Sequence, residues 1–182
     1  MAFDSQTILP AVRKWKDLES LLSAPYRYIV LLGGHIGQLK NAVDLASGAG
    51  KRILLHADLI DGLKSDDYAA EFLCQHIRPA GLISTRANVV AKTKQNGLLA
   101  IQRMFLLDSG ALEKTYALAE KTKPDFMEVL PGLLPHLIRE VKERTGTPVI
   151  AGGLIRTAEE AEAALRAGAA AVTTSQRDLW RS

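Results

Sequence analysis

Short apolar segments recur along this chain, separated by longer stretches in which apolar residues return with helical spacing. The apolar segments span residues 28–32, 53–55, 81–83, 98–101, 126–130, 149–151 and 170–173. Strands that are apolar throughout and alternate with amphipathic helices are typical of a parallel sheet with both faces covered. The pattern predicts an α/β fold with seven parallel strands.

The second half of the chain marks its helix ends clearly. Thr157 and Glu160 fit a capping box, in which each side chain accepts a hydrogen bond from the other residue's backbone amide. Gly168 supplies the left-handed residue that ends this helix. Pro135 suits the first turn of another helix, and Gly146 ends it. These signals support the repeated strand–helix units.

The first 26 residues are predicted to form a helical segment packed on the domain that the rest of the chain builds. Within residues 7–23, apolar side chains recur with helical spacing at Ile8, Val12, Trp15, Leu18, Leu21 and Leu22. A helix here would close the floor of a barrel or cover an incomplete edge.

Strand–helix repeats build either an open doubly wound sheet or a closed barrel. A dinucleotide-binding sheet normally carries a glycine-rich loop after its first strand. Here that position reads Gly33-Gly-His-Ile-Gly37, which lacks the G-x-G-x-x-G spacing, and no acidic residue ends the second strand. The sequence favours a TIM-type parallel β/α barrel, incomplete with seven strands and led by an N-terminal helix.

Composition limits the chain to one domain. Its 182 residues, 47% of them hydrophobic, suffice for one core, so we expect a single domain over 1–182. The net charge of +3 permits an anionic ligand or nucleic acid without requiring either. No leader sequence or apolar run of about 20 residues is present, which predicts a cytoplasmic protein without membrane association. The single Cys74 is expected to be a buried apolar residue.

Two strand ends in the last third of the chain suit an anion. Gly152 and Gly153 follow one apolar run, and Thr174 and Ser175 follow the next. In β/α barrels the amides after the last two strands often bind phosphate, and glycine lets the anion approach closely. Paired glycines also make plain tight turns. The spacing of Ser175 and Asp178 favours the phosphate interpretation, because it resembles the cap of a short helix with its positive end at the site.

The predicted phosphate ligands are therefore Gly152, Gly153, Thr174 and Ser175. A Gly153→Asp change is expected to abolish phosphate binding and to leave the fold largely intact, because it adds a carboxylate to the anion site.

Other polar residues follow the strands and would share one face of a barrel. Glu128 interrupts an apolar run, and a buried carboxylate needs a partner or a ligand hydroxyl. Arg103 is the expected partner, either in an ion pair that joins two strands or in a ligand site. Asp58 is suited to accept hydrogen bonds from a polyol or to cap its own loop. The predicted polar ring consists of Asp58, Glu128, Arg103, His35 and Ser84.

No catalytic or metal constellation is evident. His35 and His56 lie in no spacing that defines a metal site, and the acidic residues are scattered over different strands. A triad of Ser84, His56 and Asp58 lacks the nucleophile elbow around its serine. We therefore expect no catalytic residue, no metal and no cofactor.

Signals for nucleic-acid binding are weak. Basic residues cluster at 13–16, 51–52, 86–94 and 177–181, but no RNA-recognition aromatic motif is present and aromatics are only 5% of the chain. Solvated helix faces explain these charges equally well, so composition does not predict RNA binding.

Several strand-end phrases taken together resemble the glycerol-3-phosphate-responsive antiterminators. They are HADLIDGL at 56–63, GLIST at 81–85, IQRMFLLDS at 101–109, DFMEVLPG at 125–132, PVIAGGLI at 148–155 and AVTTS at 171–175. They cover most of the chain and keep their order. The sequence departs from the family pattern at Ala57, Asp61 and Arg86, but each change preserves charge or apolar character.

The resemblance implies a regulator that binds glycerol 3-phosphate and then contacts leader mRNA to prevent premature termination of glycerol-catabolic genes. It also implies a barrel with seven repeats. It assigns no RNA contact to a particular residue. On this hypothesis the phosphate lies on the four residues named above, and the glycerol hydroxyls lie on Asp58, Glu128 and Arg103.

Two alternatives stay open. One is a barrel enzyme of isomerase, lyase or transferase type that acts on a small phosphorylated substrate, with Asp58 or Glu128 as general base. The other is a ligand sensor that acts through a protein partner. The sequence does not decide the oligomeric state, and a homo-oligomer is among the alternatives.

Overall fold

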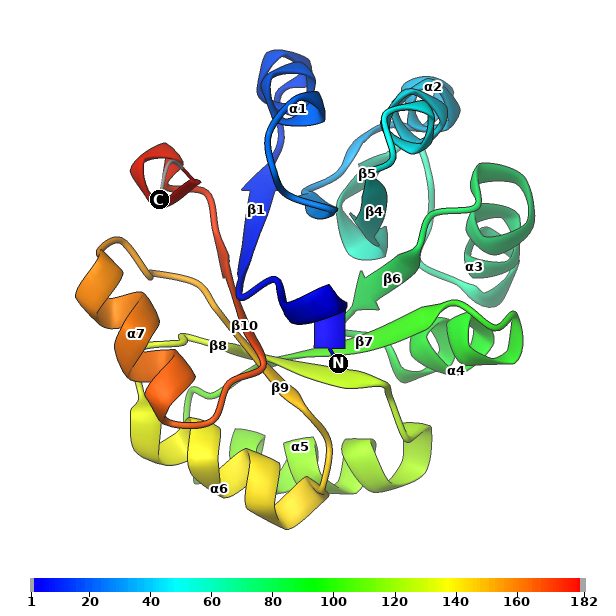
Figure 1. Cartoon of the computed structure of the whole chain (residues 1–182). Coiled ribbons are helices and arrows are strands. Elements are labelled where there is room, and N and C mark those ends of the chain that lie inside the picture. Colours follow the sequence, from blue (N-terminus) through cyan, green and yellow to red (C-terminus); the bar gives the residue numbers. More distant parts are fainter. Residues whose placement is uncertain (1, 181–182) are drawn as a thin grey trace.

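The protein is a closed parallel β/α barrel in the computed structural model, which describes residues 2–180 (Figure 1). Eight strands close the barrel in the order β1-β10-β9-β8-β7-β6-β4-β2. They are β1 (Ile8–Val12), β2 (Tyr28–Leu31), β4 (Arg52–His56), β6 (Gly81–Ser84), β7 (Leu99–Phe105), β8 (Phe126–Leu130), β9 (Val149–Gly152) and β10 (Ala171–Thr174). The barrel fold is confirmed, but the prediction of seven strands and an incomplete barrel is wrong.

Helices surround the barrel, as Figure 1 shows. They are α1 (Trp15–Leu22), α2 (Ile36–Gly48), α3 (Asp67–Phe72), α4 (Ala87–Gln95), α5 (Ser109–Thr122), α6 (Pro135–Thr145) and α7 (Ala158–Arg166). A π-helical turn, η3 (Leu73–Ile77), continues α3, and a 3-10 turn, η4 (Arg177–Trp180), follows β10. At the carboxyl end of the barrel, β3 (Gly34–His35) pairs with β5 (Ile60–Asp61), and the 3-10 turn η2 (Ala57–Leu59) precedes β5.

The missing strand is β1, which lies inside the segment expected to be a leading helix. Leu9 pairs with Thr173 of β10 and Ala11 pairs with Val30 of β2, so this strand closes the barrel. Residues 8–12 form a continuous apolar run, which is how a strand buried on both faces reads. Within residues 7–23, the helix is α1, which begins at Trp15. The apolar residues of β1 fit the same helical spacing by coincidence, so the spacing predicted one helix across both elements.

The amino end of the barrel is plugged by the 3-10 turn η1 (Ala2–Ser5), seen at the centre of Figure 1. Phe3 is 3% exposed and stacks on Phe126 with ring centroids 4.5 Å apart. It also meets the edge of Tyr28 at 5.2 Å. Since Tyr28 and Phe126 are the first residues of β2 and β8, the plug covers the ends where strands begin. The N-terminal segment therefore supplies the floor, but through residues 2–5 instead of a helix.

The helix ends in the second half follow the sequence signals. Glu160 N donates to Thr157 Oγ1 at 3.2 Å and Thr157 N donates to Glu160 Oε2 at 3.1 Å, which confirms the capping box. Pro135 occupies the first turn of α6, and Gly146 ends that helix with φ of 66°. Among residues 2–180, no helix is both long and apolar enough to cross a bilayer.

The barrel interior is apolar near the amino ends of the strands and polar near their carboxyl ends. The buried residues that fill the interior include Leu9, Ala11, Tyr28, Val30, Leu54, Ile83, Ile101, Phe126, Ile150 and Ala171. Because side chains alternate along a strand, the inward positions nearer the carboxyl ends are His56, Arg103, Glu128 and Thr173. The fold thus collects four polar side chains from four strands at the carboxyl end.

Candidate functional site

A cavity of about 340 Å³ opens at the carboxyl end of the barrel. Its lining residues come from or follow six strands: Ala11, Val30, Leu32, Arg103, Glu128, Leu130, Gly153, Leu154, Ile155, Arg156, Thr173, Thr174, Ser175 and Gln176. We refer to it as the carboxyl-end cavity. In β/α barrels this end holds the ligand, and its size suits a small molecule.

Part of the carboxyl-end cavity is lined by backbone amide groups of the loops after β9 and β10. Gly153 and Leu154 follow β9 with positive φ values of 73° and 62°, and Ser175 follows β10. Within residues 2–180, the amides of Gly153, Leu154 and Ser175 donate no backbone hydrogen bond. β9 and β10 are the last two strands of the barrel, so these amides lie where β/α barrels bind phosphate.

The two glycines serve different purposes. A Cβ on Gly152 would lie 2.5 Å from Thr173 Oγ1 and 3.0 Å from Glu128 Oε1, so Gly152 leaves room for a hydrogen bond between those side chains. Gly153 has a positive φ, and a Cβ there would lie 2.9 Å from Leu130 Cδ2. The Gly153→Asp change would therefore strain the backbone and crowd Leu130. On these grounds we expect the change to destabilise the fold as well as to disturb the anion site.

The turn after β10 is capped by a different residue from the one expected. Thr174 Oγ1 accepts a hydrogen bond from Gln176 N at 3.1 Å and donates one to Ile155 O at 3.0 Å. Trp180 Nε1 donates to Thr174 O at 2.9 Å, which ties down the turn. The Thr174 hydroxyl therefore holds the loops after β9 and β10 together. The next residue, Ser175, is exposed and lines the cavity.

A buried charged pair also lines the cavity. Arg103 Nε lies 3.7 Å from Glu128 Oε2, and the side chains are 17% and 4% exposed. Thr173 Oγ1 donates to Glu128 Oε1 at 2.8 Å, and a guanidinium nitrogen of Arg103 contacts His56 Nε2. The expected pairing of Arg103 with Glu128 is confirmed.

Burial changes the protonation of both groups that face Arg103. Burial raises the pKa of Glu128, whereas the Arg103 charge and the Thr173 hydrogen bond act to lower it. Burial and the nearby Arg103 charge lower the pKa of His56 to about 4, against a smaller opposite effect of Asp58. Since arginine can only donate, neutral His56 accepts at Nε2 and carries its proton on Nδ1.

The ion pair leaves two buried atoms without a hydrogen-bond partner among the described residues. Arg103 Nε and Glu128 Oε2 are buried, and within the described chain neither has a hydrogen-bond partner. A buried unsatisfied donor or acceptor costs about 1–3 kcal/mol, so such a pair favours a ligand that satisfies both atoms. A single hydroxyl group could accept a hydrogen bond from Arg103 Nε and donate one to Glu128 Oε2. The arrangement is suited to an alcohol.

Three members of the predicted polar ring lie elsewhere. Asp58 accepts hydrogen bonds from Ser84 Oγ at 2.5 Å and from Thr85 N and Oγ1 at 2.7 and 2.8 Å, so its carboxylate holds the loop after β6. His35 is exposed and caps α2 by accepting from Gly37 N at 3.1 Å. Asp58, Ser84 and His35 do not line the carboxyl-end cavity. Ser84 lies on the outward register of β6, and Asp58 and His35 lie in η2 and β3, outside the barrel strands.

Sequence reasoning also missed residues of the cavity. Arg156 and Gln176 line it from the loops after β9 and β10, and the Arg156 side chain forms no ion pair with any residue of the described chain. His56 and Thr173 contact the ion pair directly. His56 and Thr173 occupy inward positions at the ends of β4 and β10, so the alternation of side chains along those two strands would have found them. No local signal identifies Arg156.

Replacing His56 by glutamine is expected to change how stability depends on pH. In the native protein His56 stays neutral down to about pH 4, whereas the unfolded chain takes up this proton near pH 6.5. The unfolding free energy of the wild type therefore falls by about 3 kcal/mol between pH 6.5 and 4 through this group. His56→Gln lacks this contribution, so denaturant titrations should show the stability gap between the two proteins narrowing as pH falls. A constant gap would show that His56 is not held neutral.

The structure offers no second centre of obvious chemistry. Cys74 is buried, and burial raises its pKa to about 11, which makes it a poor nucleophile. Across residues 2–180, no three His, Cys, Asp or Glu side chains come together in an arrangement that could hold a metal ion.

Comparisons with known proteins give one consistent result. The family model of the glycerol-3-phosphate responsive antiterminators matches residues 8–180. A glycerol uptake operon antiterminator regulatory protein from Listeria monocytogenes is 47% identical with a TM-score of 0.97, covering 100% of this chain and 98% of that one. A related protein from Thermotoga maritima is 30% identical with a TM-score of 0.86 and covers 97% and 99%. The uncharacterized protein YgcP of Escherichia coli is 30% identical over 95% of this chain and 91% of its own.

More distant barrels share only the architecture. A deoxyribose phosphate aldolase from Aeropyrum pernix is 16% identical with a TM-score of 0.69, covering 93% of this chain and 85% of that one. At this identity the likeness concerns the fold and carries no statement about activity.

Proposed function

This chain belongs to the glycerol-3-phosphate responsive antiterminators, and from that premise we propose that glycerol 3-phosphate binds in its carboxyl-end cavity and controls its binding to leader mRNA. The protein is thereby a transcription antiterminator of glycerol uptake genes. The observation that carries the proposal is the cavity itself, which combines amides that have no backbone partner within residues 2–180 with a buried ion pair that has two unsatisfied atoms.

The phosphate group is assigned to the loops after β9 and β10. The amides of Gly153, Leu154 and Ser175 donate to it, and Arg156 supplies a positive charge at the mouth of the cavity. Amides fixed by their loops need no reorganisation when an anion arrives. Thr174 acts indirectly in this proposal, because its hydroxyl joins the two loops. Gly152 gives the Glu128–Thr173 hydrogen bond its space.

The glycerol end is assigned to Arg103 and Glu128. A hydroxyl group placed between Arg103 Nε and Glu128 Oε2 satisfies two buried atoms that otherwise lack partners within residues 2–180. A phosphate site and an ion pair in one cavity select a small phosphorylated alcohol over inorganic phosphate or glycerol alone.

We assign the site to binding and not to turnover. Acid–base chemistry on a bound substrate needs a donor and an acceptor placed on the reacting atoms. Glu128 is the one carboxylate lining the cavity, and it is held by Thr173 and Arg103. Asp58, the other expected base, is fully engaged by Ser84 and Thr85. The cavity therefore favours a ligand that stays unchanged.

Titration calorimetry with the purified protein tests the ligand assignment. Glycerol 3-phosphate is expected to bind saturably, and glycerol or inorganic phosphate at the same concentration is expected to bind at least tenfold more weakly. Incubation with the protein should leave glycerol 3-phosphate chemically unchanged. Absence of saturable binding would overturn the proposal, and protein-dependent turnover would instead favour a barrel enzyme.

A further inference from the structure

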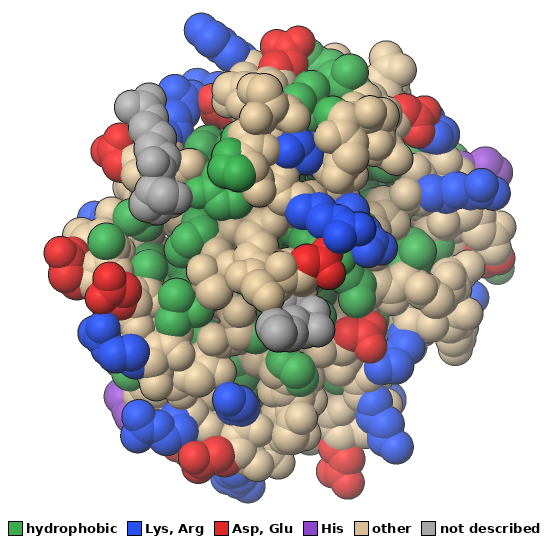
Figure 2. All heavy atoms as spheres, viewed as in Figure 1, with side chains coloured by type: hydrophobic (Ala, Val, Ile, Leu, Met, Phe, Trp, Pro, Cys, Tyr) green, Lys and Arg blue, Asp and Glu red, His purple; other side chains and the backbone are tan. Residues whose placement is uncertain are grey.

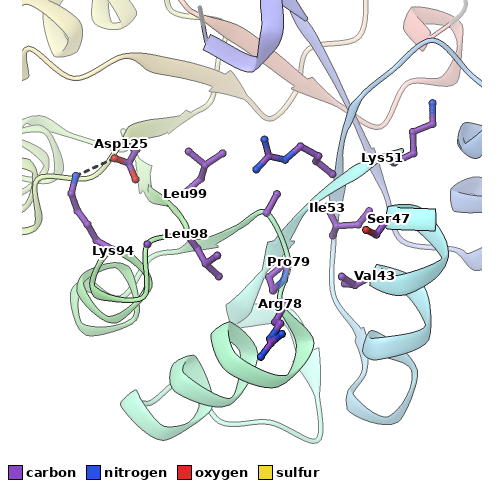
Figure 3. A pocket seen from close by; sticks show the side chains of 13 residues that line it. Val43, Ser47, Lys51, Ile53, Arg78, Pro79, Lys94, Leu98, Leu99 and Asp125 are labelled. Carbon is purple, nitrogen blue, oxygen red and sulfur yellow. Dashed lines mark hydrogen bonds and ion pairs between the residues drawn. The ribbon is translucent and has the colours of Figure 1, made fainter. Parts of the chain in front are cut away.

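The amino end of the barrel carries a second concave feature, far from the loops that form the carboxyl-end cavity. It has a volume of about 560 Å³ and lies where the turns leading into β4, β6 and β7 meet (Figure 3). Its charged side chains are Lys51, Arg52, Arg78, Lys94 and Asp125. We refer to it as the amino-end groove. In Figure 3, Lys94 lies beside Asp125 on one side and Lys51 lies on the other.

The amino-end groove is strongly positive. Four cationic side chains and one carboxylate line it. The carboxylate, Asp125, already accepts hydrogen bonds from the protein. Asp125 Oδ1 accepts from Lys94 Nζ at 3.1 Å, and Asp125 Oδ2 accepts from Ala100 N at 2.8 Å. Figure 2 views the molecule from this end and shows Lys and Arg side chains near the centre of the face as well as around its rim. Such a surface attracts polyanions.

Two arginines of the groove keep donors for a ligand. Arg78 Nε donates to Gln75 O at 2.8 Å, and one terminal nitrogen of Arg52 donates to the Tyr28 hydroxyl at 3.0 Å. Of the carboxylates in residues 2–180, none forms an ion pair with Arg52 or Arg78. A guanidinium without a carboxylate partner is suited to bind a phosphate through two parallel hydrogen bonds.

The backbone conformation of Arg78 makes a controlled substitution possible. Six helix ends at this end of the barrel are followed by a residue with positive φ: Gly50, Arg78, Gly97, Lys123, Gly146 and Gly168. Glycine occupies four of these turns, as the left-handed conformation favours. Arg78 adopts it with φ of 57° despite the steric penalty of a Cβ. Glycine fits this turn, so an Arg78→Gly change removes the side chain without straining the backbone.

We propose that the amino-end groove binds the phosphate backbone of RNA, with Arg78 and Arg52 on phosphates and Lys51 and Lys94 adding to the positive field. The inference rests on the proposed function, since it names the surface of this chain that meets the leader mRNA. RNA recognition begins with such backbone contacts, which position the strand without reading its sequence. The half-buried Leu98 and Leu99 give the groove an apolar wall for ribose.

The test compares Arg78→Gly with Lys123→Gly in a filter-binding assay. The probe is the leader transcript of the host's glycerol uptake operon, with saturating glycerol 3-phosphate. Arg78→Gly removes one phosphate contact, so RNA affinity at 0.1 M salt is expected to fall about fivefold and the salt slope by about 0.7. Lys123→Gly removes the same charge and the same strain at a helix end outside the groove, and should bind like the wild type. Arg78→Lys keeps the charge but loses the two parallel hydrogen bonds, so its affinity is expected to lie between those of the wild type and Arg78→Gly.

Folding and ligand binding serve as controls. Arg78→Gly relieves a left-handed residue, so its thermal midpoint is expected to stay level or rise by about 2 °C. Its calorimetric titration with glycerol 3-phosphate should match the wild type, because the carboxyl-end cavity is untouched. Equal RNA binding by Arg78→Gly and the wild type, or an equal loss in Lys123→Gly, would overturn the groove assignment and leave the proposed function standing. If the wild type itself binds no leader RNA, the RNA part of the proposed function fails.

Discussion

Ser175→Asp is expected to abolish glycerol 3-phosphate binding without disturbing the fold. Ser175 is exposed at the mouth of the carboxyl-end cavity, and its amide has no backbone partner in residues 2–180. An aspartate there puts a carboxylate about 5 Å from the bound phosphate, which costs about 3 kcal/mol per charge pair at an effective dielectric constant of about 20. Calorimetry should therefore show a loss of affinity of about a hundredfold or more.

Ser175→Ala is the matched control for this variant. It removes the hydroxyl but keeps the amide, so its affinity is expected to stay within about threefold of the wild type if the backbone binds the phosphate. Both variants should melt like the wild type, because the side chain is exposed. Wild-type affinity in Ser175→Asp would place the phosphate elsewhere. Equal losses in both variants would mean that the hydroxyl, and not the amide, holds it.

Arg103→Met is expected to lower the unfolding free energy by about 3 kcal/mol at neutral pH. It leaves Glu128, whose side chain is 4% exposed, without its nearby cation. The loss of the Arg103 charge also removes an influence that lowers the pKa of Glu128, so the carboxyl protonates more easily in the variant. A protonated carboxyl needs no counter-charge, so the stability gap to the wild type should shrink as pH falls. Denaturant titrations across pH measure both effects.

The double variant Arg103→Met with Glu128→Gln separates a charge effect from lost packing. If the unpaired carboxylate causes the destabilisation, the double variant is expected to be more stable than Arg103→Met alone. A double variant that is as unstable as the sum of the two single changes would show that the residues act independently. Both variants should lose affinity for glycerol 3-phosphate, because each removes an atom that the proposed hydroxyl contact uses.

The repeating part of the fold could be predicted from the sequence, and its closure could not. Seven strands form short apolar runs between helices with recognisable caps, so each one can be recognised from its own stretch of sequence. The eighth, β1, contains Pro10 and runs into α1 with the apolar spacing of one long helix. Its apolar run fits a strand as well as a helix, and its pairing with both β10 and β2 decides for the strand. That pairing is a non-local fact that no window of sequence contains.

The candidate site was predictable where a chemical conflict was visible in the sequence. Glu128 stood out because a carboxylate in an apolar strand needs a partner, and the partner is Arg103. Asp58 and Ser84 looked equally promising, yet they bond to each other, since strand-end residues differ in the direction they face. Arg156 has no local signature at all. Its role depends on the loop after β9 reaching over the cavity.

The most direct test of the account is the affinity for leader RNA measured with and without saturating glycerol 3-phosphate at one fixed salt concentration. If the ligand controls RNA binding, the affinity should rise about tenfold or more when it is added, within the usual range of coupling between two sites. By linkage, saturating RNA should then tighten glycerol 3-phosphate binding by the same factor. An RNA affinity that does not change when glycerol 3-phosphate is demonstrably bound would contradict the account.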